Sequence, residues 1–357
     1  MKQFRFFSAL FFSIVSIALS VRADKVDDFI KTEMEKRQTP GLSLMIIRDG
    51  KPIKSAAYGL SNLELKTPAT LQTVFEIGSI TKQITAAGIL MLQEEGKLFV
   101  DDKISRFFPD IPTSWTNISV RHLLSHTSGI KSYTGLNGFE LTKKLTQKQF
   151  IAALAPLPLE FAPGEQYKYC NSGYSLLGYI IENVSGKNYW EFLGERIFTP
   201  LQMTTATNRE PSIIVPHRAA GYEFRNGKPI NRDYDLTDVF SAGAIVMTVG
   251  DLAKWNASLD TEKILSGESK KQMWTSGTLN NGKAHGYGFG WRIDSYQGHT
   301  NIGHSGATSG FTASLQRFPE EKLCVIVLCN SDESNLATTL ARTIGSFYLE
   351  KKVAAQP

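Results

Sequence analysis

The sequence predicts an α+β fold in which one antiparallel sheet, formed from the N- and C-terminal segments, is flanked by helices. Strand-like runs occur near both ends of the chain, whereas helical patterns and loops dominate the middle. Strands from both ends can share one sheet only if the intervening chain leaves it and returns. We therefore expect a mostly helical lobe, about residues 97–240, inserted into an α/β lobe of about residues 24–96 and 241–357.

The first two predicted strands form a hairpin. Residues 42–47 and 53–58 are rich in apolar and small residues, and Asp49-Gly50 between them is a strong signal for a tight turn. The two strands are therefore expected to pair with each other.

Helices are expected after Ser79, ending near Gly96, and again in the middle of the chain. Apolar residues at helical spacing between residues 174 and 184, followed by Gly186, predict a helix with a glycine at its C-terminal end. The C-terminal region is expected to contain four strands and a terminal helix, over residues 287–293, 299–304, 311–318, 323–329 and 334–351.

The first 23 residues have the pattern of a secretory signal peptide. A short basic region, an apolar stretch over residues 6–19 and the small residue Ala23 follow one another. The alternative is an uncleaved membrane anchor, but the apolar run is short for a span. We expect cleavage after Ala23, a secreted or periplasmic location, no stable membrane span in the mature chain, and a single catalytic domain over residues 24–357.

Composition narrows the function classes further. The chain has 357 residues, 42% hydrophobic and 20% charged, as is ordinary for a globular protein. Removing residues 1–23 removes three basic residues and no acidic one, so the formal net charge falls from +5 to +2. No dense basic stretch remains, which argues against a dedicated nucleic-acid binder.

The three cysteines are Cys170, Cys324 and Cys329. Residues 324 and 329 lie five positions apart in one strand-like run, so their side chains point to opposite faces and cannot pair. The cysteines are expected to be buried thiols, and they have no metal-type spacing. No metal or organic cofactor is implied.

Ser79-Ile80-Thr81-Lys82 is the most informative motif. A serine hydroxyl needs a base within hydrogen-bond reach to act as a nucleophile, and a lysine three residues later lies on the same helical face. The same spacing occurs at Ser128 and Lys131, but the glycine-containing segment around them is typical of a loop. The alternative for Ser79 is an ordinary helix N-cap.

The second motif is Tyr169-Cys170-Asn171, just before the helix that ends at Gly186. An ammonium group beside Tyr169 would lower the pKa of its phenol, which could then exchange a proton with the serine oxygen or the leaving group. Asn171 offers both a donor and an acceptor to a substrate amide. The alternative is that Tyr169 is a core aromatic residue and Asn171 a helix cap.

The third motif is His304-Ser305-Gly306-Ala307, at the end of a predicted strand. The backbone N–H of Ala307, together with that of Ser79, could provide the two donors that an oxyanion needs. The alternative is a glycine-rich turn between strands.

In their order along the chain, these motifs resemble those of the class C β-lactamase and penicillin-binding-protein-like serine hydrolases, which include esterase and D-aminopeptidase-like members. The resemblance extends over nearly the whole mature chain. It also includes residues 122–130, 163–164, 171–174 and 241–243. It implies a β-lactamase/transpeptidase-like fold.

The resemblance further implies that Ser79 is the acylated nucleophile and that Lys82 and Tyr169 are its proton-transfer partners. Asn171 would position the acyl part of the substrate. The opposite wall would consist of the third motif, His304, Ser305 and Gly306, with Ala307 completing the oxyanion hole.

Two positions depart from the family pattern. His304 stands where lactam-hydrolysing members usually have a lysine that helps to hold a substrate carboxylate, and a histidine is largely neutral near pH 7. This departure favours similarity to the esterases, D-amino-acid peptidases and peptidoglycan-linked hydrolases. Cys170 stands where serine is commoner and leaves Tyr169 and Asn171 intact.

Two competing motifs are rejected. Residues 303–307 match the nucleophile elbow of α/β-hydrolases, but no histidine follows Ser305 and the next segment has a strand pattern. His122 and His126 have the spacing of zinc ligands on a helix, but the intervening glutamate of the protease motif is absent. A structural role is expected for both histidines.

The sequence thus predicts a secreted or periplasmic serine hydrolase that acts through an acyl-enzyme on ester or amide substrates, either small molecules or peptides. A link to peptidoglycan is one option. The alternatives are a penicillin-binding-like protein that binds cell-wall peptides with little or no turnover, and a true class C-type β-lactamase.

Overall fold

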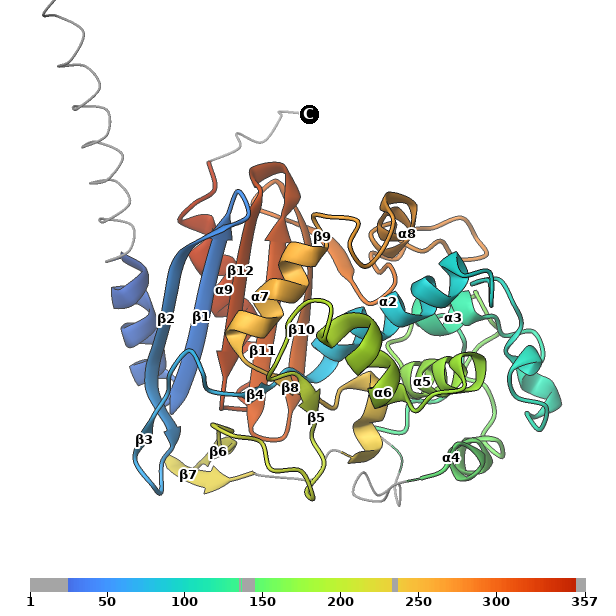
Figure 1. The fold of residues 1–357 in the computed structure, drawn as a ribbon, viewed down its shortest axis with the longest axis horizontal. Helices are drawn as coiled ribbons and strands as arrows, with labels where there is room; N and C mark the ends of the chain where they lie inside the picture. The colour runs from blue at the N-terminus through green and yellow to red at the C-terminus, as the bar shows by residue number, and fades with distance from the viewer. Residues whose placement is uncertain (1–24, 135, 137–144, 233–236, 351–357) are drawn as a thin grey trace, which may run out of the picture.

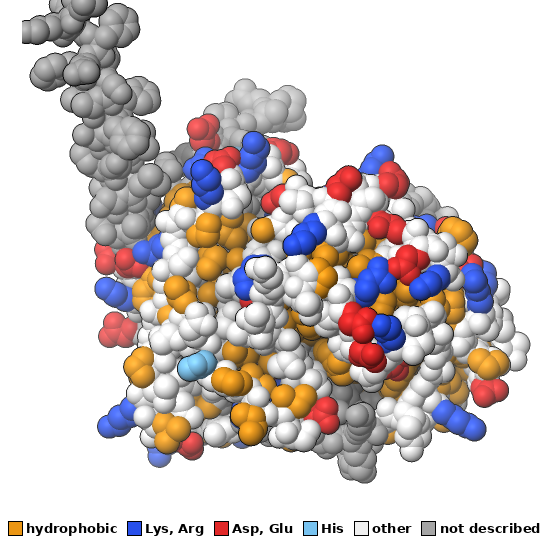
Figure 2. All heavy atoms as spheres, in the orientation of Figure 1, with side chains coloured by type: hydrophobic (Ala, Val, Ile, Leu, Met, Phe, Trp, Pro, Cys, Tyr) orange, Lys and Arg blue, Asp and Glu red, His pale blue; other side chains and the backbone are white. Residues whose placement is uncertain are grey.

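The computed structural model describes residues 25–134, 136, 145–232 and 237–350 (Figure 1). The predicted signal peptide, residues 1–23, lies outside the described residues. Within these residues, no helix is both long enough and apolar enough to cross a membrane. Figure 2 shows basic and acidic side chains interspersed over the face in view, with no continuous basic patch there.

A seven-stranded antiparallel sheet is the centre of the fold and confirms the predicted fold class. Its N-terminal strands meet its C-terminal strands where β1 pairs with β12. Across the sheet the order is β3 (Thr67–Pro68), β2 (Lys51–Asn62), β1 (Gly41–Arg48), β12 (Leu323–Cys329), β11 (Phe311–Phe318), β10 (His299–Thr308) and β9 (Arg292–Tyr296). The predicted hairpin at Asp49-Gly50 joins β1 to β2.

The two faces of the sheet pack against different helices. One face contacts α9 (Leu336–Ser346) and a helix over residues 25–36, whereas the other contacts the large core that includes α2. Side chains of β12 alternate between the two cores, so Cys329 belongs to the first core and Cys324 to the second. Both thiols and Cys170 are free and buried, as predicted.

Helix α2 (Thr81–Glu94) lies between the sheet and the helical part of the chain (Figure 1). Every residue from Thr81 to Leu92 is buried, which explains why its sequence has no polar face. The other helices are α3 (Val120–Leu124), α4 (Gln147–Leu154), α5 (Asn171–Ser185), α6 (Tyr189–Leu193), α7 (Val249–Ser258) and α8 (Gly267–Met273). Helix α5 ends at Gly186 in the left-handed conformation, as predicted.

Short elements complete the described chain. One three-stranded sheet has the order β4 (Phe75–Glu76), β8 (Ile245–Met247) and β5 (Thr207–Asn208), and a hairpin joins β6 (Tyr222–Arg225) to β7 (Lys228–Asn231). The short 3₁₀ helices are η1 (Gly78–Ile80), η2 (Ile104–Arg106), η3 (Thr113–Trp115), η5 (Thr237–Ala242) and η6 (Pro319–Glu321), and η4 (Gly194–Phe198) is a π-helix.

Two predicted boundaries are wrong. The strand predicted at 287–293 begins only at Arg292, because Gly286 and Gly290 have φ values of +74° and +81° and interrupt an extended chain. The terminal helix, predicted over 334–351, ends at Ser346. Element ends depend on tertiary packing, which the local pattern does not contain.

Candidate active site

Ser79 lies in the short turn η1 that leads directly into α2. Gly78 before it has a φ of +51°, a conformation that glycine adopts without strain. The residue that precedes α2 is Ile80, and it makes no capping bond with its side chain. Ser79 is therefore not the N-cap of this helix, and its side chain remains partly exposed.

Lys82 is completely buried in the first turn of α2, and its amine contacts three oxygen atoms. The Nζ lies 3.0 Å from Ser79 Oγ, 2.8 Å from Asn171 Oδ1 and 2.6 Å from the Ala242 carbonyl oxygen. Burial, and to a lesser extent the charge of Arg292, hold the pKa of Lys82 well below its ordinary value of 10.5.

The three contacts of the Lys82 amine suit its neutral form. A neutral amine has two N–H donors and one lone pair. The amide oxygen of Asn171 and the carbonyl oxygen of Ala242 can only accept, so they take the two donors. In the neutral form the lone pair is then directed to Ser79, whose hydroxyl can donate a proton to it, whereas a protonated amine would donate to Ser79 Oγ at the same distance.

Tyr169 is close to Lys82, but its pKa differs from the prediction. The Lys82 Nζ lies 4.8 Å from the centre of the Tyr169 ring, and the buried Tyr169 hydroxyl makes no well-formed hydrogen bond with any described residue. Burial raises the pKa of Tyr169 well above 10, and the nearby Ser79 hydroxyl and Arg292 offset only part of the rise. The expected lowering of this pKa is wrong because desolvation by burial exceeds the lowering effects of Ser79 and Arg292.

Asn171 is the first residue of α5 and connects Lys82 to the opposite loop. Its Oδ1 accepts from Lys82, and its Nδ2 donates to Thr134 Oγ1 at 3.2 Å. Its own backbone N–H donates to Ser132 Oγ at 3.1 Å. The N-cap of α5 is Cys170, so the Asn171 side chain is held at the site by Lys82 and Thr134 rather than used as a cap.

The third motif lies on β10 and approaches η1 very closely. A β-carbon added to Gly306 would lie 1.9 Å from the Ile77 carbonyl oxygen and 3.2 Å from the Ser79 nitrogen. One added to Gly78 would lie 2.7 Å from the Ala307 nitrogen. The two glycines therefore permit the backbone nitrogens of Ser79 and Ala307 to lie near each other, as an oxyanion hole requires.

His304, the first residue of the third motif on β10, is buried and does not face solvent. Its Nε2 lies 2.9 Å from the Tyr287 hydroxyl and its Nδ1 lies 2.6 Å from the Ser305 carbonyl oxygen. Because that carbonyl can only accept, Nδ1 is the protonated nitrogen and Nε2 accepts from Tyr287. Burial lowers the pKa of His304 to about 3, so it is neutral, as expected. Ser305, the next residue of β10, is partly exposed.

His126 and Arg292 belong to the site, although the sequence did not assign them roles there. The Nδ1 of His126 accepts from the Cys170 N–H at 3.0 Å, its carbonyl accepts from the Lys168 N–H, and its ring centre lies 4.3 Å from that of Tyr169. His126 thus fixes the backbone on both sides of Tyr169. The available signal in the sequence was that His126 lies within residues 122–130, one of the segments that carry the family resemblance.

Arg292 is the exposed first residue of β9, and its guanidinium carbon lies 5.8 Å from the centre of the Tyr169 ring. Its charge lowers the pKa of Lys82, Tyr169 and His304. Arg292 therefore contributes a positive potential at the site that the buried, neutral His304 does not supply. A single exposed arginine belongs to no motif, so sequence reasoning had no ground to select it.

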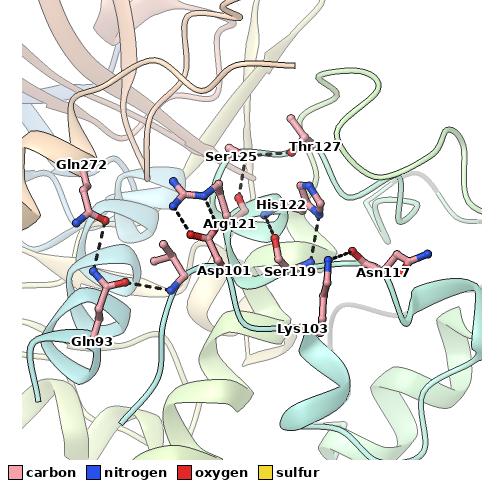
Figure 3. Close-up of polar contacts among 11 residues, drawn as sticks. Gln93, Asp101, Lys103, Asn117, Ser119, Arg121, His122, Ser125, Thr127 and Gln272 are labelled. Carbon is pink, nitrogen blue, oxygen red and sulfur yellow. Dashed lines mark hydrogen bonds and ion pairs between the residues drawn. The ribbon is translucent and has the colours of Figure 1, made fainter. Parts of the chain in front are cut away.

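His122 has a structural role, as predicted. Figure 3 shows it in a polar network around α3, where its Nδ1 accepts from the Ser119 N–H while Ser119 Oγ accepts from the His122 N–H. Arg121 beside it forms two hydrogen bonds with Asp101. Within the described ranges, no group of three or more His, Cys, Asp or Glu residues could hold a metal ion.

Comparison with known proteins shows the family of the chain. The profile of the family described as Beta-lactamase matches residues 26–347, which is most of the chain. The chain belongs to this family. Its members are therefore the proper reference for the fold and for the three motifs.

Two curated relatives illustrate the relationship. Protein flp of Staphylococcus aureus (strain MW2) is 29% identical over 316 residues, covering 86% of this chain and 62% of flp, so this chain spans about three fifths of that relative. Penicillin-binding protein 4* of Bacillus subtilis (strain 168) is 30% identical over 317 residues, covering 84% of this chain and 70% of the relative.

Two solved structures are similar throughout. The octameric penicillin-binding protein homologue from Pyrococcus abyssi has a TM-score of 0.79 and 31% identity, covering 91% of this chain and 76% of the homologue. The D-amino acid amidase from Ochrobactrum anthropi SV3, solved with L-phenylalanine amide, has a TM-score of 0.75 and 25% identity. The match covers 90% of this chain and 96% of the amidase.

Proposed function

We propose that this protein is a serine hydrolase that cleaves amide or ester bonds through an acyl-enzyme formed on Ser79. The observation that supports this most directly is the buried amine of Lys82, whose pKa is depressed and whose Nζ lies 3.0 Å from Ser79 Oγ. A neutral amine at this distance is a general base for the serine hydroxyl.

In the proposed acylation step, Ser79 Oγ attacks the substrate carbonyl carbon while its proton moves to Lys82 Nζ. The carbonyl oxygen becomes an oxyanion, which accepts hydrogen bonds from the N–H groups of Ser79 and Ala307. When the tetrahedral intermediate collapses, the bond to the leaving group breaks and that group needs a proton.

Tyr169 is proposed to pass this proton on as a neutral phenol. Its raised pKa means that it resists forming a phenolate, so it can donate its O–H proton to the leaving group while it regains one from the Lys82 ammonium. The acyl-enzyme is then hydrolysed by water, with the same groups accepting and returning the proton. Asn171 is proposed to orient the acyl part of the substrate.

Amides and peptides are the proposed substrate class, with esters as the alternative. The support is the similarity to a D-amino acid amidase and to penicillin-binding proteins. The exposed Arg292 beside Tyr169 favours substrates with an anionic group near the scissile bond. Efficient lactam hydrolysis is less favoured, because the buried His304 offers no charge to a substrate carboxylate.

Secretion or periplasmic location, and a role in peptidoglycan chemistry, are further parts of the proposal. They rest on the signal-like residues 1–23 and on the names of the penicillin-binding relatives. Binding of cell-wall peptides with little turnover is the second candidate function, since the penicillin-binding proteins in the comparison are named for binding.

Intact-mass measurement of the mature chain with benzylpenicillin, and separately with a fluorophosphonate probe, tests the proposal. A mass increase that Ser79→Ala abolishes is the expected result. The lifetime of the penicilloyl adduct then separates fast hydrolysis from stable binding. A native protein that neither reagent labels, alongside no hydrolysis of a panel of amides and short-chain esters, would overturn the proposed function.

A further inference from the structure

The Ala242 carbonyl group, which accepts from the Lys82 amine, belongs to a strained turn. Two residues before Ala242, Phe240 has φ +44° and ψ −132°, which interrupts the helical turns of η5. A bulky residue with positive φ is rare and is retained only where the surrounding structure enforces it. The turn closes because the N–H groups of Gly243 and Ala244 both donate to the Phe240 carbonyl, at 3.2 and 2.9 Å.

Aromatic packing holds Phe240 in this conformation. Its ring centre lies 4.8 Å from that of Tyr189, 5.1 Å from that of Tyr179 and 6.0 Å from that of Trp190. Aromatic pairs at such distances contribute to stability beyond the area that they bury. Three ring contacts can therefore offset the backbone strain at Phe240.

The close approach of this turn to α5 depends on Gly178. A β-carbon at Gly178 would lie 2.6 Å from Phe240 Cε1 and 2.1 Å from Ser241 Oγ. In the space that the glycine leaves, Ser241 Oγ donates to the Tyr174 carbonyl oxygen at 2.9 Å. The turn is thus fixed to α5 at its middle residue.

The same turn is also fixed to α2, the helix of Lys82. Thr85 Oγ1 donates to the Ser241 carbonyl oxygen at 2.7 Å and lies 2.7 Å from the Tyr189 hydroxyl. The Ala242 carbonyl oxygen then accepts from Lys82 at 2.6 Å. A change in the backbone at Phe240 would therefore move the acceptor that orients the Lys82 amine.

We propose that Phe240 is a positioning residue for catalysis: its strained backbone, held by Tyr179, Tyr189 and Trp190, directs the Ala242 carbonyl to Lys82. This inference rests on the proposed function of Lys82 as the base for Ser79. Without this acceptor, the amine would be free to turn its lone pair away from the serine hydroxyl.

Substitutions at Phe240 separate strain from packing. Phe240→Ala loses the ring contacts but keeps a β-carbon that opposes positive φ, so the turn should relax. Phe240→Gly loses the same contacts but adopts positive φ freely, so the turn can persist. Strain of this size corresponds to a factor of roughly 5 to 150 in the population of a conformation.

The test compares Phe240→Ala, Phe240→Gly and Phe240→Tyr with the wild type. The rate of Ser79 labelling by a fluorophosphonate probe is measured well below the melting temperature of every variant, so that unfolding does not contribute. We expect labelling to fall about tenfold or more in the alanine variant, to be several-fold faster in the glycine variant than in the alanine variant, and to be close to wild type in the tyrosine variant. Glycine no faster than alanine would overturn the inference.

Melting temperatures give a readout that needs no activity. At an unstrained loop position glycine destabilises relative to alanine through the unfolded chain. At Phe240 we expect the reverse order, with Phe240→Gly melting above Phe240→Ala. If the wild type is not labelled at Ser79, the proposed function fails, and a glycine variant that melts below the alanine variant would independently refute the strained turn.

Discussion

The burial of Lys82 predicts a specific pH dependence for the stability of this protein. Its side chain is fully buried, and burial holds its pKa in the folded protein well below 10.5. In the unfolded chain the same amine has a pKa of about 10.4. Between these two pKa values the unfolded state binds one more proton than the folded state. The free energy of unfolding therefore rises with pH over this window, and the amine destabilises the fold as pH falls.

Lys82→Met removes this titration while filling a similar volume. One proton changes the free energy of unfolding by about 1.4 kcal/mol per pH unit. Wherever the folded amine is neutral and the unfolded amine is charged, the stability of the variant relative to the wild type should therefore fall at this rate as pH rises. Other titrating groups are common to both proteins and cancel in the difference to first order.

Urea titrations of the mature wild type and Lys82→Met at pH 7, 8 and 9, followed by tryptophan fluorescence, measure this difference. Ser79→Ala is the matched control, because it keeps the buried amine and should keep the wild-type pH dependence. A difference between Lys82→Met and wild type that does not change with pH would show that Lys82 is protonated in the folded protein. That result would refute its assignment as the general base.

Three further substitutions test the rest of the site, each by the rate of Ser79 labelling with a fluorophosphonate probe. Gly306→Ala should reduce the rate about a hundredfold or more, because the new β-carbon would lie 1.9 Å from the Ile77 carbonyl oxygen. Relief of this clash would separate the backbone N–H groups of Ser79 and Ala307. An unchanged labelling rate would exclude this oxyanion hole. Arg292→Gln should move the acidic limb of the pH–rate profile to higher pH, because removing that charge raises the pKa of Lys82; a shift to lower pH would contradict the assigned electrostatics. His126→Phe should lower the rate roughly tenfold, because the buried Cys170 N–H loses its acceptor beside Tyr169, and wild-type labelling would rule out a positioning role for His126.

Local patterns were sufficient to predict the sheet and the close approach of Lys82 to Ser79, the proposed nucleophile. The Asp49-Gly50 turn and the apolar runs at both ends of the chain describe contacts between neighbouring residues or between whole strands. The spacing of Ser79 and Lys82 is close to one helical turn, and the turn η1 continued by the start of α2 brings Nζ to 3.0 Å from Oγ.

The parts that the sequence did not predict depend on contacts between distant segments. The Ala242 carbonyl is an acceptor for Lys82, yet a backbone carbonyl has no sequence signature. The ring of His126 is placed against Tyr169 only by packing of the helical region. The interrupted strand at 287–293 follows from glycines whose positive φ serves the turns around them rather than an extended chain.

The pKa of Tyr169 was expected to be lowered, and it is raised for a physical reason. The motif indicates that an amine lies near the phenol, and a charged amine would favour phenolate. The motif does not indicate that both groups are buried. An ammonium and a phenolate would each have to leave water, which costs several kcal/mol per ion and is regained only with ideal pairing. The Tyr169 hydroxyl has no such pairing partner among the described residues. Burial therefore favours the neutral form of both groups, and in the proposed mechanism the neutral pair accepts the proton of Ser79 and supplies one to the leaving group.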